Sequence, residues 1–173
     1  MGQMRREFLT WEDVDELLDH LLPQFDEEFD AMVLITRGGI IPGGLLAEAM
    51  NITHILTAAV DFPAQLEMEQ TGLYVWPRFI QFPADHLLED RLTLIVDDVW
   101  GSGRTITSVR NRVEAAGGYP FSCVFHFNPY RNLFGDARPN YYVAVTDAHI
   151  IYPWEIDRDV DRALLDASPK PSS

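Results

Sequence analysis

A pair of acidic side chains precedes a short glycine-rich turn in the middle of the chain. Asp97 and Asp98 follow an apolar run at 92–96 that has the length of a buried strand. The turn then reads Gly101, Ser102, Gly103, Arg104 and Thr105. Beyond it, apolar residues recur at helical spacing up to residue 116, where Gly117 supplies a C-terminal stop. The pattern predicts a strand, an acidic tip, a turn and a helix.

A glycine-rich turn that opens a helix can bind a phosphate group. Its backbone N–H groups and the positive end of the helix dipole point at one place, and glycine lets the backbone approach a ligand closely. Ser102 and Thr105 add hydroxyl donors. The two carboxylates suit ribose hydroxyls, or a Mg²⁺ ion held through water. A ribose 5-phosphate would satisfy both ends, whereas the alternative is an ordinary turn whose Asp caps the helix.

A second glycine turn follows another buried strand, expected at 32–35. It reads Thr36-Arg37-Gly38-Gly39 and leads into a helix expected from Pro42 to Met50. Turns that leave parallel strands meet at the C-terminal edge of the sheet, so the two turns are expected to lie together. Taken alone, the second turn could equally be a tight turn with a surface arginine.

Both turns resemble those of the type I phosphoribosyltransferases. The string IVDDVWGSGRT is similar to that family's signature for phosphoribosyl pyrophosphate (PRPP), with Ser102 where Thr is more usual. The resemblance implies that Asp97 and Asp98 are the catalytic acids, which contact the ribose and hold Mg²⁺ through water. It also implies that residues 101–105 bind the 5-phosphate. The string LITRGGIIPGGLLAE is similar to the pyrophosphate loop of the xanthine/guanine branch, which implies that Arg37 and Gly38 bind pyrophosphate.

The same resemblance implies a nucleobase site. The string HIIYPWE is similar to the base-pocket segment of that branch, so His149 would stack on the base and Ile150 would offer backbone polar groups. Two positions depart from the branch: Gly101 stands where an Asp handles the purine proton, and Asn128 where a lysine reads the 6-oxo group. Asn128 can still hydrogen-bond a carbonyl. His126 and His149 are candidate replacement proton carriers, because histidine titrates near neutrality.

Composition narrows the function classes. The chain of 173 residues has a net charge of −14, which argues against binding to nucleic acid or to an anionic membrane. Its one lysine is Lys170, in the polar tail, which argues against a Schiff-base mechanism, and the glycine turn has no lysine, which excludes a Walker A loop. The single cysteine, Cys123, rules out a disulfide within the chain, which fits a cytoplasmic protein. No apolar run reaches transmembrane length.

The expected fold is α/β, similar to type I phosphoribosyltransferases, with a mainly parallel sheet flanked by helices. One domain is expected over residues 1–167, with a disordered tail at 168–173. Helices are expected from the Thr10 cap to Pro23 and around 160–165, and strands at 54–60, 121–127 and 141–145. The segment at about 61–90 has no clean periodicity. We expect it to form a hood over the substrate or a hairpin packed on a partner subunit.

The sequence thus predicts a Mg²⁺-dependent phosphoribosyltransferase of nucleotide salvage. It would transfer the 5-phosphoribosyl group from PRPP to a nucleobase, with a purine favoured, and release pyrophosphate. A homo-oligomer, either dimer or tetramer, is expected. The alternatives are a regulatory protein that binds PRPP or a nucleotide with little turnover, and an unrelated phosphosugar-binding domain.

Overall fold

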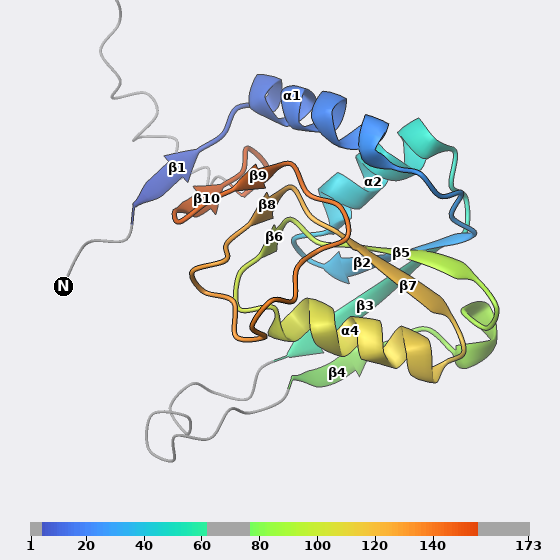
Figure 1. Cartoon of the computed structure of the whole chain (residues 1–173). Helices are drawn as coiled ribbons and strands as arrows, with labels where there is room; N and C mark the ends of the chain where they lie inside the picture. Colours follow the sequence, from blue (N-terminus) through green and yellow to red (C-terminus); the bar gives the residue numbers. More distant parts are fainter. Residues whose placement is uncertain (1–4, 62–76, 156–173) are drawn as a thin grey trace, which may run out of the picture. The chain divides into compact units, whose positions relative to one another are not determined.

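The computed structural model describes residues 5–61 and 77–155 (Figure 1). The chain divides into two compact units, each with its own contacts. The described part of the first unit comprises residues 5–16 and 148–155, and that of the second comprises 17–61 and 77–147. In these parts of the chain, no helix is both long and apolar enough to cross a membrane.

A five-stranded sheet forms the centre of the second unit, in the order β4-β3-β2-β5-β7. Neighbouring strands are parallel from β3 to β7, and β4 pairs antiparallel with β3 at one edge. The predicted α/β class and mainly parallel sheet are therefore confirmed. The strands are β2 (Ala31–Thr36), β3 (Ile55–Asp61), β4 (Arg78–Gln81), β5 (Leu92–Val96) and β7 (Tyr119–Cys123).

Helix α4 (Arg104–Ala115) follows the predicted glycine turn. Its apolar positions Ile106, Val109 and Val113 are buried in the core, as their spacing predicts. Gly117, at φ 82°, provides the left-handed residue that ends the helix. The core of this unit joins that helix face to the sheet through Val33 and Ile95, among others.

Helix α2 (Ile40–Met50) begins two residues before the predicted start at Pro42. Proline is tolerated there because the first N–H groups of a helix have no partner within it. The helix ends at Asn51 in the left-handed conformation, at φ 53°. The remaining helices are α1 (Trp11–Leu21) and the short 3₁₀ turns η1 (Leu22–Gln24) and η2 (Asp85–Leu87).

The prediction of one continuous strand at 121–127 is wrong. Strand β7 ends at Cys123, and a separate strand β8 (His126–Phe127) joins a three-stranded sheet with β6 (Val99–Trp100) and β9 (Ala144–Val145). The break arises because the N–H groups of residues 125 and 126 both donate to the carbonyl of Asp98, at 3.0 and 3.2 Å. The strand expected at 141–145 is correspondingly short, and Tyr141 makes only an isolated bridge to Cys123.

The first unit contains a two-stranded parallel sheet of β1 (Arg6–Phe8) and β10 (His149–Ile151). The helix cap expected at Thr10 is present. Its N–H donates to Asp13 Oδ2 at 2.7 Å, and the Asp13 N–H donates back to the Thr10 hydroxyl at 3.2 Å. The hydrogen bonds that the Thr10 N–H and hydroxyl donate to the Asp13 carboxylate lower the pKa of Asp13.

Part of the expected hood lies within the described residues. Strand β4 lies within it and pairs antiparallel with β3, while a hairpin packed on a partner subunit remains a prediction. Residues 62–76, the helical piece expected at 160–165 and the tail at 168–173 lie outside the described residues. The single domain over 1–167 and the closure of a hood remain predictions.

The interior strand β5 gives a direct test of this core. Leu94 is fully buried, so Leu94→Ala should lower the free energy of unfolding by about 2–5 kcal/mol in a urea titration. Leu133 is 46% exposed, so Leu133→Ala should change it by less than about 1 kcal/mol. Equal effects of the two substitutions would contradict the assigned core.

Candidate active site

The two predicted turns meet at one edge of the five-stranded sheet. Strands β2 and β5 are parallel neighbours with Leu34 opposite Val96, so the turns that follow them leave the sheet side by side (Figure 1). Gly38 lies directly against the acidic pair. A Cβ added to Gly38 would lie 2.6 Å from Asp98 Cγ and 2.7 Å from Asp97 Oδ1, closer than real contacts allow. The pyrophosphate turn expected from sequence and the two acids thus form one site.

The acidic pair is fixed by backbone hydrogen bonds. The Asp98 N–H donates to Asp97 Oδ1 at 2.9 Å, and the Val99 N–H donates to Asp98 Oδ1 at 2.7 Å. Both acids are half-buried. Burial raises the pKa of Asp97 well above its usual range, and the neighbouring charge of Asp98 raises it further. A ligand hydroxyl or a cation at this place would relieve that repulsion.

The glycine turn after the acids encloses a small pocket of about 70 Å³. Gly103 has φ 80°, a conformation that favours glycine, and it directly precedes helix α4. The Arg104 N–H lies 3.4 Å from the Ser102 hydroxyl. The pocket has the composition of an anion site at a helix N-terminus. It is lined by Asp97, Val99, Trp100, Gly101, Ser102, Gly103, Thr105 and Ile106.

The side chain of Trp100 packs against this turn, a role that was not predicted from the sequence. Its indole packs so closely against Gly103 that a Cβ there would lie 2.5 Å from Nε1. The same Nε1–H donates to Asn132 Oδ1 at 3.2 Å, and the Leu133 N–H donates to the Ser102 carbonyl at 3.0 Å. The loop after β8 therefore holds the glycine turn at 101–105 in place. A tryptophan between an acidic pair and a glycine turn was the available signal.

The turn after β2 combines one exposed side chain with one tightly packed glycine. Arg37 is exposed, and the peptide bond that precedes it, Thr36–Arg37, is cis. A Cβ on Gly39 would collide with the Val96 carbonyl oxygen and lie 2.8 Å from the Ile35 carbonyl. The backbone of this turn thus packs on β5 itself, while the guanidinium of Arg37 is accessible to a ligand.

The residues expected to bind a base fall in different units. Asn128 is buried in the second unit, where its Oδ1 accepts the Tyr130 N–H at 3.2 Å. His149 and Ile150 lie on β10 in the first unit, the former exposed and the latter buried. A common base pocket of all three remains a prediction.

His126 does not suit the proton-carrying role considered for it. The side chain is buried, and desolvation lowers its pKa to about 4. It therefore stays neutral near pH 7 and is a weak base, poorly suited to take up the purine proton.

Known proteins that are similar to this chain include two phosphoribosyltransferases. No family model matches the chain. The xanthine-guanine phosphoribosyltransferase of Chromohalobacter salexigens is 27% identical over 162 residues, covering 91% of this chain and 89% of that protein. The structure of a purine phosphoribosyltransferase from Pyrococcus horikoshii Ot3 is 26% identical, with a TM-score of 0.73, over 90% of this chain and 97% of that one.

The chain resembles the type I phosphoribosyltransferases in sequence and in fold. The predicted enzyme class, one that transfers a pentosyl group, is confirmed at this level, and a purine phosphoribosyltransferase is the activity to which these relatives point. A second similar structure is that of a hypothetical protein from Neisseria gonorrhoeae with bound ppGpp. It has 20% identity and a TM-score of 0.77, and the match covers 95% of this chain and 97% of that one, a likeness of fold alone.

The resemblance to type I phosphoribosyltransferases implies a Mg²⁺ ion, and the residues of this site offer part of the ligand set that Mg²⁺ needs. Asp97 and Asp98 offer hard oxygen ligands, and the raised pKa of Asp97 marks a place where a cation would be favourable. Among residues 5–61 and 77–155, no group of three or more His, Cys, Asp and Glu could hold a metal ion. The two acids alone would leave most coordination positions to water and substrate oxygens.

The raised pKa of Asp97 predicts how stability depends on pH. In the folded protein the ionised carboxylate is disfavoured, so the folded state binds more protons than the unfolded one above pH 3.8, the usual aspartate value, and stability falls as the pH rises towards the raised pKa. Asp97→Asn keeps the Oδ1 acceptor for the Asp98 N–H but removes this penalty. In ligand-free protein it should raise the melting temperature at pH 7, and the gain should vanish near pH 3. A gain that is equal at both pH values would contradict the assignment.

Proposed function

We propose that this protein is a phosphoribosyltransferase that uses PRPP and Mg²⁺ to attach a phosphoribosyl group to a purine-like base. The observation that carries the proposal is the contact of Gly38 with Asp97 and Asp98 beside the phosphate turn. It gives an anion site at either end of a pair of carboxylates, which is the order of charges in a ribose with a 5-phosphate and a 1-pyrophosphate. The enzyme class of the relatives agrees with this chemistry.

In the proposed reaction a ring nitrogen of the base forms a bond to C1 of the ribose, and the bond from C1 to pyrophosphate breaks. The transition state has cationic character at the ribose, so orientation and electrostatics supply most of the catalysis. Asp97 and Asp98 bind the ribose hydroxyls and stabilise that charge. The turn at 101–105 holds the 5-phosphate, and Arg37 with Gly38 binds the leaving pyrophosphate. Bound Mg²⁺ would neutralise charge on the phosphate oxygens.

A regulatory nucleotide-binding protein is the second candidate, and the position of Gly101 favours it. The xanthine/guanine branch has a carboxylate there that handles the base proton. A Cβ at Gly101 would meet nothing within 4 Å, so an acidic side chain has room but is absent. The similar fold of the Neisseria protein was solved with the nucleotide ppGpp. This candidate predicts ligand binding without release of pyrophosphate.

The double substitution Asp97→Asn with Asp98→Asn tests the proposal. Pyrophosphate release from PRPP and Mg²⁺ with a panel of purines should fall by at least about a hundredfold, because both carboxylates touch the reacting sugar. Binding of PRPP with Mg²⁺, measured by calorimetry, should weaken as well. The matched control is Asp15→Asn with Asp19→Asn, which removes the same charge from the exposed face of α1. Wild-type kinetics in the double variant would refute the role of the acids. Tight binding of PRPP by the wild-type protein without any release of pyrophosphate would select the regulatory candidate.

A pair of glycine substitutions tests the contact itself. Gly38→Ala places a methyl group against the two carboxylates and should displace them, so PRPP binding in the presence of Mg²⁺ should weaken at least about tenfold. Gly44→Ala, in the same helix–turn segment, points into open space and should leave binding unchanged, while adding up to about 1 kcal/mol of stability. If the two variants bind PRPP equally well, Gly38 does not border the ligand.

A further inference from the structure

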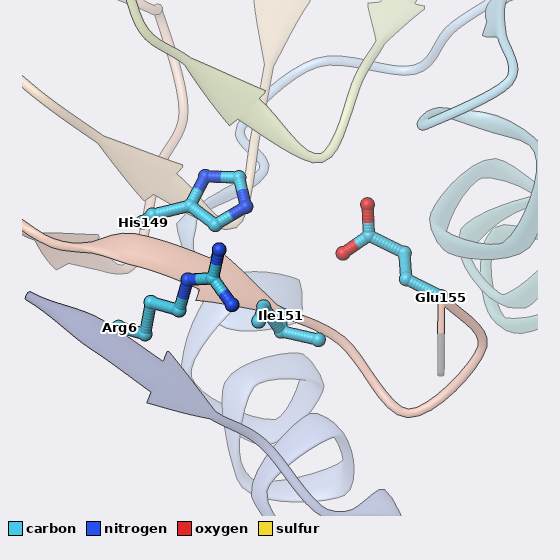
Figure 2. Close-up of a pocket in the computed structure, with 4 residues that line it drawn as sticks. All are labelled: Arg6, His149, Ile151 and Glu155. Carbon is cyan, nitrogen blue, oxygen red and sulfur yellow. The ribbon is translucent and has the colours of Figure 1, made fainter. Parts of the chain in front are cut away.

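The first unit contains a pocket of about 360 Å³, lined by Arg6, His149, Ile151 and Glu155 (Figure 2). This volume lies in the range of small-molecule sites. We propose that Arg6 is a specificity-determining residue that, together with Glu155, reads the lactam edge of a nucleobase held in this pocket. The inference rests on the proposed function, which supplies the base, but it concerns a residue to which neither the turns nor the resemblance gives a role.

The sheet of the first unit places Arg6 and His149 together. Strands β1 and β10 are parallel, with Arg6 opposite His149 and Phe8 opposite Ile151. Paired residues of neighbouring strands project from the same face, so Arg6, His149 and Ile151 share one face of this sheet. Figure 2 shows the guanidinium beside the imidazole, with the Glu155 carboxylate pointing into the same space from the other side.

The side chains that line the pocket differ in their exposure and in their hydrogen bonds. Arg6 and His149 are exposed, and among the described residues the Arg6 side chain has neither an ion pair nor a hydrogen bond. Glu155 is held at one oxygen, because its Oε2 accepts the Tyr152 N–H at 2.9 Å. The buried Ile151 provides an apolar wall. The pocket thus presents the donors of Arg6, which no described residue engages, together with a positioned acceptor and a flat ring.

This set of groups selects for a particular ring edge. Guanidinium only donates hydrogen bonds and an ionised carboxylate only accepts them, while an imidazole face can stack on a base. The complementary ligand is a flat heterocycle with a carbonyl oxygen next to a ring N–H, which is the lactam edge of hypoxanthine or guanine. Adenine has the reverse order, since its amino group would face the arginine and its unprotonated ring nitrogen would face the carboxylate.

Arg6 can also supply the cationic donor for the base carbonyl that the xanthine/guanine branch obtains from a lysine. The position where the xanthine/guanine branch has a carbonyl-reading lysine holds Asn128, a neutral and shorter donor. Lys170 is the one lysine of the chain, so a cation for this task must be an arginine. Arg6 is an arginine already in a pocket with the residue expected to stack on the base.

Binding of a matched pair of bases tests the proposal. Hypoxanthine and adenine differ at the 6-position and the adjoining ring nitrogen, so calorimetry on the full chain isolates the edge that Arg6 would read. Wild-type protein should prefer hypoxanthine, and Arg6→Gln should lower its affinity for hypoxanthine by about tenfold while changing that for adenine much less. Glu155→Gln keeps an acceptor for the Tyr152 N–H and should weaken guanine binding, because it loses the charge that faces the N–H groups.

The control is Arg5→Gln, which removes an equal charge from the preceding residue. The guanidinium of Arg5 lies 3.9 Å from Glu7, a residue on the other face of β1, outside the pocket. Melting curves of each variant establish that it is folded. The proposal is overturned if neither base binds, if wild type does not prefer hypoxanthine, or if Arg6→Gln behaves like Arg5→Gln. Base binding that depends on Arg6 without pyrophosphate release from PRPP would instead refute the proposed function and leave this inference intact.

Discussion

The close approach of one backbone turn to two carboxylates is the constraint on which the site depends. Strands β2 and β5 are hydrogen-bonded neighbours, so the turns that follow them must share the few ångströms of space at the sheet edge. Any side chain at position 38 would occupy the place of the Asp98 carboxylate, and any at position 39 would overlap the last carbonyl of β5. Glycine at both places is therefore a packing requirement, which also exposes backbone amides to a ligand.

Much of this arrangement was predictable because local sequence and tertiary role coincide. The apolar run of β5, the helical spacing of Ile106, Val109 and Val113, and the glycine at 117 each specify one element, and the elements appear where they were expected. Parallel neighbours then bring their C-terminal turns together by geometry alone. The contact between Gly38 and the acids needed no information beyond strand order.

The strand predictions that were wrong or missing have a common cause, because these strands are set by long-range backbone hydrogen bonds. Residues 121–127 are mostly apolar, and all but Phe121 are buried, so hydrophobicity carries no sign of the break after Cys123. The break is set by the carbonyl of Asp98, more than twenty residues earlier in the chain. Strand β1 was missed because it is three residues long and exposed along its length, and it owes its existence to pairing with β10.

The charge of the chain gives the site a second constraint. A protein of net charge −14 that binds an anionic sugar phosphate must obtain attraction locally, from backbone amides, a few arginines and a cation. The acidic pair opposes that attraction: burial and the neighbouring charge of Asp98 raise the pKa of Asp97, so a cation bound beside the pair would remove an unfavourable interaction. In the proposed function, affinity for the sugar phosphate would therefore depend on a metal ion that binds with it. Such a site would favour a complete substrate with its metal over free phosphate, since phosphate alone adds negative charge beside the two acids.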